Sequence, residues 1–135
     1  TDRGNEGFVF RGDDGLDELS ISTTSTVIQI NDGKMKSETL DPSELGIMPS
    51  PISELKGGDA KENARLALEV FSGKQGAMRD ATLLNAAAAI AAFKADFHLG
   101  ILQQFANAMV LAKQAIDSGA ATLLVESWRN VSNSA

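Results

Sequence analysis

The order of hydrophobic and polar residues divides the chain near residue 49. Before that point valine, isoleucine, threonine and phenylalanine alternate with polar residues and turn signals, a pattern typical of β-strands. After it, alanine and leucine recur at helical spacing. The pattern predicts an α+β fold with a strand and hairpin part over residues 1–48 and a helical part over residues 49–135.

Three short strands are expected in the first part, at residues 8–10, 26–30 and 35–40. The last two flank Asp32-Gly33, a dipeptide suited to a type I′ hairpin turn because both central positions need positive φ. In that register Ile28, Ile30 and Met35 share one face of the hairpin. We expect this apolar face to pack against the rest of the protein.

About four helices are expected in the second part, near residues 60–71, 79–93, 101–118 and 121–128. Asp59 can cap the first, and Glu62 follows three residues later as in a capping box. The second helix is apolar on nearly every side, so we expect it to be buried. Its Asn85 must find hydrogen-bond partners there, and structural bonding to a neighbouring segment is the favoured interpretation.

Composition excludes several classes of site. The 135 residues contain no cysteine and one histidine, which excludes disulfides and thiolate metal sites and leaves little basis for a protein-only zinc site. The net charge is −6 with scattered basic residues, which argues against binding to nucleic acid. The longest apolar stretch, 86–93, is too short to span a bilayer, so we expect no membrane contact.

The beginning of the chain and the absence of cysteine give two further expectations. Residue 1 is Thr1 and the stretch after it does not resemble a signal peptide, so we expect the start to be a cut in a longer chain. The absence of cysteine fits a reducing cytoplasm.

The stretch "GDDGLDELS" places four carboxylates directly after the first expected strand, at Asp13, Asp14, Asp17 and Glu18. The order of residues does not match an EF-hand loop. Magnesium usually takes one or two carboxylates together with water and substrate phosphates, so the adjacent Asp17-Glu18 pair suits a partial magnesium site. Composition alone favours the alternative, a solvated acidic turn.

Two other features have a structural interpretation. Gly57-Gly58 precedes a helix but leads into Asp59, whose carboxylate can occupy the free N–H groups that a phosphate would use. His98 lies between two expected helices with no recognisable catalytic partners. We therefore assign no catalytic or cofactor-binding residue in this chain.

Five motifs together resemble the C-terminal portion of the anthranilate phosphoribosyltransferase family: "GDDGLDELS", "LDPSELGI", "LKGGDAKENA", "RDATLLNAAAAI" and "AIDSGAA". Their order and spacing cover nearly the whole chain, and the "STTST" stretch is similar to actinobacterial members. The resemblance implies that residues 1–135 are the later part of an α/β domain of the nucleoside phosphorylase–phosphoribosyltransferase type. The parent chain is expected to be more than twice as long and homodimeric.

The resemblance also implies the chemistry. The family joins anthranilate to the ribose of phosphoribosyl pyrophosphate and releases pyrophosphate, with Mg²⁺, in tryptophan biosynthesis. By match to the family motif, Asp17 and Glu18 bind the magnesium ion, whereas Asp13 and Asp14 are turn residues. The family's "GTGGD" pyrophosphate loop and its anthranilate-binding residues are not in this sequence, so the chain alone is expected to be inactive.

One departure and two alternatives accompany this assignment. Many relatives read Gly-Pro-Thr where this chain has Thr23-Thr24-Ser25, which leaves the shape of that turn open. A pyrimidine nucleoside phosphorylase is the enzymatic alternative, although "GLDE" favours the transferase. A nucleic-acid-binding relative of the same fold is the other, and the negative charge counts against it.

Overall fold

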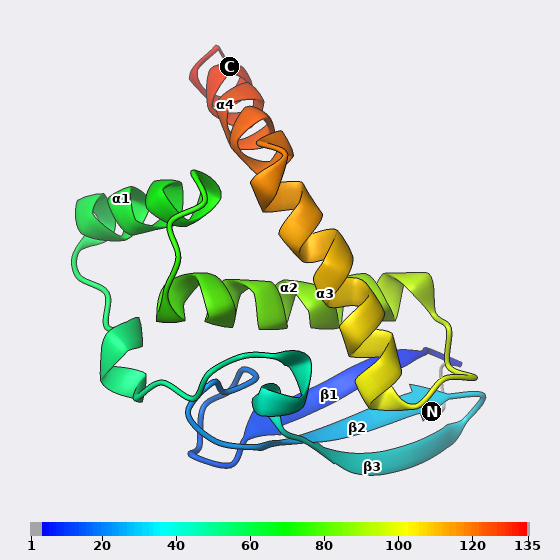
Figure 1. Ribbon diagram of the computed structural model, residues 1–135. Helices are drawn as coiled ribbons and strands as arrows, with labels where there is room; N and C mark the ends of the chain where they lie inside the picture. The colour runs from blue at the N-terminus through cyan, green and yellow to red at the C-terminus, as the bar shows by residue number, and fades with distance from the viewer. Residues whose placement is uncertain (1–3, 135) are drawn as a thin grey trace.

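The computed structural model describes residues 4–134, which form a three-stranded sheet, two short 3-10 helices and four α-helices (Figure 1). The strands are β1 (Gly7–Gly12), β2 (Ser25–Asn31) and β3 (Lys34–Leu40). The helices are η1 (Pro42–Leu45), η2 (Ile52–Leu55), α1 (Ala60–Phe71), α2 (Ala77–Lys94), α3 (Ile101–Asp117) and α4 (Ala120–Asn133). Strands followed by helices confirm the α+β class.

The sheet is antiparallel, with strand order β1-β2-β3. Asn31 pairs with Lys34 across the predicted two-residue turn. Asp32 has φ 49° and Gly33 has φ 70°, as a type I′ turn requires. The hairpin and its register are therefore confirmed.

The prediction for the buried face of this hairpin is wrong. Met35, on the face expected to be covered, is 69% exposed, whereas Val27 and Leu40 on the opposite face are buried. The buried face also carries Gln29, whose Oε1 accepts a hydrogen bond of 2.9 Å from Gln104 of α3. Because α3 satisfies this amide, the less apolar face can be buried.

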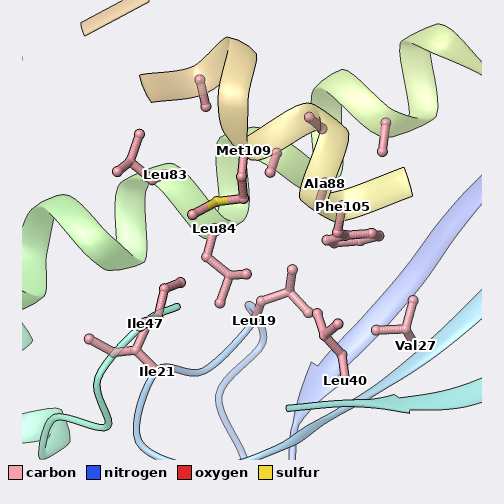
Figure 2. Packing of buried hydrophobic residues seen from close by; sticks show 14 of the residues in the cluster. Leu19, Ile21, Val27, Leu40, Ile47, Leu83, Leu84, Ala88, Phe105 and Met109 are labelled. Atoms are coloured by element: carbon pink, nitrogen blue, oxygen red, sulfur yellow. The ribbon is translucent and has the colours of Figure 1, made fainter. Parts of the chain in front are cut away.

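Helices α2 and α3 pack against each other over one face of the sheet, with α2 in contact with β1 and α3 in contact with β3. In Figure 1, α3 crosses α2, and α4 continues away from the sheet. The core between the layers combines strand, loop and helix residues, including Leu19, Ile21, Val27, Leu40, Ile47, Leu83, Leu84, Ala88, Phe105 and Met109 (Figure 2).

Most of α2 is covered, and its exposed residues are Ala89, Phe93 and Lys94. The side toward α3 and the sheet is buried through Leu84, Ala87, Ala88 and Ala91, but Phe93 is 91% exposed. The small alanine side chains let the two helices approach closely. The prediction of burial is therefore confirmed for most of the helix, with Ala89 and Phe93 as the exceptions within residues 79–93.

The ends of the helices follow the capping signals in part. Asp59 Oδ1 accepts a hydrogen bond of 2.9 Å from the Glu62 N–H, as predicted for the α1 cap. The Glu62 carboxylate instead accepts from Arg65, with 2.9 Å between Oε2 and Nε, so the reciprocal half of the capping box is absent. Helix α4 begins after Gly119 and continues to Asn133, five residues beyond the predicted end.

Within residues 4–134, none of the individual helices combines the length and the hydropathy that crossing a bilayer requires. Helices α3 and α4, bent by 63°, meet the length and composition criteria only as a pair.

Candidate functional site

The acidic loop, residues 13–24, joins β1 to β2 and folds back on the end of β1. The Gly12 N–H lies 3.0 Å from both the Leu16 and the Glu18 carbonyl oxygens, and the Asp13 N–H donates to the Thr24 oxygen at 3.0 Å. A Cβ atom at Gly12 would lie 2.5 Å from Asp14 Oδ1. Glycine at this position therefore permits the close turn.

Asp14 organises the inside of this loop. Its Oδ2 accepts hydrogen bonds from the Ser22 hydroxyl at 2.6 Å and the Ser20 hydroxyl at 2.7 Å, and its Oδ1 accepts from the Leu16 N–H at 3.1 Å. The hydroxyls of Ser22 and Ser20 hold the pKa of the Asp14 carboxyl below its ordinary value. Both oxygens of this carboxylate are thus occupied within the loop.

Both carboxylate oxygens of Asp13 accept hydrogen bonds from threonine hydroxyls. Its Oδ2 accepts from Thr24 Oγ1 and its Oδ1 from Thr26 Oγ1, at 2.5 Å and 3.1 Å. Ser25 Oγ accepts from the Ser20 N–H at 3.0 Å. Two of the three residues in the Thr23-Thr24-Ser25 departure therefore bond to the loop directly, which gives the turn its shape in this chain.

All four acidic residues of the loop are exposed, and Asp17 and Glu18 differ from Asp13 and Asp14 in their contacts. Among the described residues, their carboxylates take part in no hydrogen bond or ion pair. Asp13 and Asp14 hold the loop together, while Asp17 and Glu18 present free oxygens to the solvent. The structure thus separates the four acidic residues into two pairs with different surroundings.

Leu19 fixes the loop immediately after this free pair. Its side chain is buried in the core beside Leu84 (Figure 2). Its N–H donates to Asn85 Oδ1 at 3.0 Å, and its carbonyl accepts from Asn85 Nδ2 at 3.1 Å. The prediction that Asn85 bonds a neighbouring segment is confirmed, but the sequence did not indicate that this segment is the acidic loop.

Glu18 lies beside an open groove of about 530 Å³ between the acidic loop, η2, α1 and α2. Its other lining residues are mostly apolar: Leu55, Leu66, Ala67, Val70, Met78, Ala81, Thr82, Asn85 and Ala86. Residues 4–134 contain no group of three or more histidine, aspartate or glutamate side chains that could hold a metal ion. Two free carboxylates nevertheless fit magnesium, which takes its remaining ligands from water and phosphate oxygens.

The other two features have the structural role expected of them. The Gly58 N–H donates to Asn63 Oδ1 at 2.8 Å, and Asn63 Nδ2 donates to the Gly58 carbonyl at 3.1 Å. With Asp59 as the cap, side chains of the chain itself take the donors that a phosphate would need. His98 is exposed in the turn between α2 and α3.

Comparison with known proteins identifies the family. Residues 3–122 match the family described as "Glycosyl transferase family, a/b domain". The chain belongs to this family.

Curated proteins similar to this chain include several named anthranilate phosphoribosyltransferase. Those of Rhodococcus jostii (strain RHA1) and Arthrobacter sp. (strain FB24) are each 47% identical to this chain, over 97% and 93% of it. The chain spans only 36% of the length of each. The resemblance inferred from the five motifs is confirmed.

Solved structures agree with the sequence relatives. The anthranilate phosphoribosyltransferase from Saccharomyces cerevisiae in complex with 4-fluoroanthranilate has a TM-score of 0.84 at 30% identity, covering 98% of this chain and 37% of that one. The same yeast enzyme in complex with PRPP and Mg has a TM-score of 0.76 at 31% identity, covering 90% and 33%. The fold of this chain thus recurs within a chain about three times as long.

Proposed function

We propose that this chain is the C-terminal third of an anthranilate phosphoribosyltransferase. That enzyme transfers the phosphoribosyl group of phosphoribosyl pyrophosphate to anthranilate and releases pyrophosphate, a step of tryptophan biosynthesis. The observation that carries the proposal is 47% identity over 97% of the chain to a relative of that name. Residues 1–48 contribute the acidic motif, and residues 49–135 contribute the helical part of the same α/β domain.

Within this enzyme, Asp17 and Glu18 hold Mg²⁺. The support for this metal role is local, because these are the two carboxylates of the acidic loop that form no hydrogen bond or ion pair with a described residue. Their negative charge and adjacency suit a hard cation with oxygen ligands. When bound, the metal ion supplies charge neutralisation to the departing pyrophosphate.

The chain by itself offers only part of an active site. Two carboxylates leave most of a six-ligand magnesium shell to water and phosphate. Transfer between two substrates also requires both to be held in line, which can contribute about 7–11 kcal/mol to lowering the barrier. We therefore propose that the isolated chain is inactive. From the family resemblance we further propose that the active enzyme is a cytoplasmic homodimer without nucleic-acid or membrane partners.

A chimera tests the function. The part of the Rhodococcus jostii protein that this chain does not match is joined to this chain, and loss of anthranilate fluorescence is followed with phosphoribosyl pyrophosphate and Mg²⁺. The chimera is expected to turn over, whereas the isolated chain is not. A folded chimera without turnover contradicts the proposed activity.

Substitutions in the chimera test the metal pair. Glu18→Gln and Asp17→Asn remove charge while nearly keeping shape, and each is expected to raise the Mg²⁺ concentration for half-maximal rate by about tenfold or more. Asp13→Asn is the matched control, because Asp13 is committed to Thr24 and Thr26. Equal effects of Glu18→Gln and Asp13→Asn would assign the metal to a different part of the loop.

A further inference from the structure

We infer that Asn85 is a positioning residue that orients the Asp17-Glu18 pair by holding the peptide group that follows it. The inference rests on the proposed metal role of that pair and adds a residue from another part of the chain. Asn85 lies on α2, 66 positions from Leu19 in sequence. Among the described residues, its side chain is the only one that forms hydrogen bonds with both the N–H and the carbonyl of Leu19.

The peptide unit between Glu18 and Leu19 is held at both of its polar ends. Its carbonyl, that of Glu18, accepts from the Gly12 N–H at 3.0 Å. Its N–H, that of Leu19, donates to Asn85 Oδ1 at 3.0 Å. The plane of this peptide is therefore fixed between the end of β1 and the middle of α2, and it sets the direction in which the Glu18 side chain leaves the backbone.

A second bond prevents rotation about the first. Asn85 Nδ2 donates to the Leu19 carbonyl at 3.1 Å, so the carboxamide bonds both backbone groups of Leu19, as an adjacent strand would. The same Nδ2 donates to the Ala81 carbonyl at 3.1 Å, one turn earlier in α2. The Asn85 side chain is thus held in one orientation by its own helix. Its bonds to Leu19 in turn restrict the motion of the acidic loop.

The anchor lies on a well-packed part of the molecule. Leu84, next to Asn85, is fully buried, and Leu19 belongs to the same buried cluster. Magnesium requires near-octahedral geometry with short oxygen distances, so a loop that samples several orientations binds it less well. Loss of the Asn85 hydrogen bonds is therefore expected to raise the dissociation constant for the metal ion while the chain stays folded.

Two substitutions separate these effects. Asn85→Leu keeps the approximate volume and removes every side-chain hydrogen bond. Asn85→Ser loses the reach to Leu19 but leaves a hydroxyl that can bond the Ala81 carbonyl within the helix, so it remains informative if Asn85→Leu does not fold.

The matched control is Gln104→Met in α3. Gln104 is a buried amide, whereas Asn85 is half-buried, and the Gln104 Nε2 likewise makes two contacts, to Gln29 Oε1 at 2.9 Å and to the Leu99 carbonyl at 2.8 Å. Neither contact belongs to the acidic loop. Its substitution reports the general cost of losing a buried amide.

The first measurement needs no metal. Amide hydrogen exchange and ¹⁵N relaxation are recorded for the 135-residue chain and its variants. In both Asn85 variants, exchange at Leu19 is expected to accelerate about tenfold beyond the change in Gln104→Met, and the order parameters of Asp17 and Glu18 are expected to fall. Unchanged order at Asp17 and Glu18 in a folded Asn85 variant would overturn the inference.

The second measurement uses Mn²⁺ as a paramagnetic probe in the same samples. The native chain is expected to show saturable broadening at Asp17 and Glu18, with the apparent dissociation constant raised about tenfold in Asn85→Ser and less than twofold in Gln104→Met. An equal rise in both variants would overturn the inference. If the native chain shows no broadening at this pair, the proposed metal role fails, and the metal-free measurement decides the role of Asn85.

Discussion

The Nη2 atom of Arg79 lies 2.7 Å from Oδ1 of Asp117, which ties the first turn of α2 to the last turn of α3. The Arg79 side chain is 5% exposed and that of Asp117 is 56% exposed. A buried charge without its partner is costly, so this pair is expected to matter more for stability than the exposed pairs of α1.

Asp117→Asn tests this relationship. Breaking a fully buried pair costs about 3–5 kcal/mol, and the solvent around the half-exposed Asp117 reduces that cost. The free energy of unfolding by urea is expected to fall by about 1–3 kcal/mol. The control is Glu38→Gln, which breaks the Lys36–Glu38 pair at the same 2.7 Å, where the cation Lys36 is 66% exposed and Glu38 is 32% exposed. Because removing Glu38 leaves no buried cation unpaired, this substitution is expected to cost less than about 1 kcal/mol. Equal losses would mean that Arg79 does not depend on its partner.

Two phenylalanines provide a second contrast. Phe105 of α3 is fully buried, with its ring centroid 5.3 Å from that of Phe8 at 70°. Phe105→Ala is expected to lower the free energy of unfolding by about 3–5 kcal/mol, because it removes buried contacts and leaves a cavity. Phe93→Ala, at an exposed position of α2, is expected to change it by less than about 0.5 kcal/mol. Similar losses would contradict the assignment of the core.

The hydroxyls around Asp14 predict a pH response of the acidic loop. The folded-state pKa of Asp14 is lowered, first by the Ser22 hydroxyl and then by that of Ser20. A lowered folded pKa means that the stabilisation is complete above the unfolded value of about 3.9 and is lost as the pH falls through the folded value.

Ser22→Ala is therefore expected to raise the pKa of Asp14. The pKa is measured by NMR titration of the Asp14 carboxyl carbon. Asp41 is the internal control, because hydrogen bonds from Ser43 lower its pKa at a separate site. A shift of Asp41 equal to that of Asp14 would point to a global change.

The free edge of β1 predicts self-association of the isolated chain. Asp13 N–H bonds to Thr24 on the β2 side, and alternation along an antiparallel strand directs the N–H groups of Phe8 and Phe10 toward the other edge. The described residues place no strand there. Unpaired strand edges and exposed apolar side chains tend to associate.

Val9→Lys tests this edge, because Val9 is 55% exposed on β1 and an edge lysine opposes pairing. In sedimentation velocity the native chain is expected to form larger species as its concentration rises, and Val9→Lys is expected to remain monomeric. Val131→Lys on α4, where Val131 is 66% exposed, serves as the control. A monomeric native chain at high concentration contradicts the prediction.

The local sequence was sufficient to predict structure wherever the interaction that determines it lies within a few residues. The Asp32-Gly33 turn and the Asp59 cap depend on backbone conformation and on hydrogen bonds over two or three positions, and both appear as predicted. The candidate metal pair, Asp17 and Glu18, could likewise be named from its motif. Its expected role comes from the family resemblance and stays a prediction.

Only the tertiary structure decided which surfaces are buried and what holds the acidic loop. The less apolar face of the hairpin is buried because α3 supplies Gln104 to Gln29, a contact 75 residues apart in sequence. The acidic loop is anchored because α2 brings Asn85 to Leu19 across 66 residues. Periodicity along one segment reports which side chains share a face, but a hydrogen bond between distant segments depends on how the helices pack over the sheet.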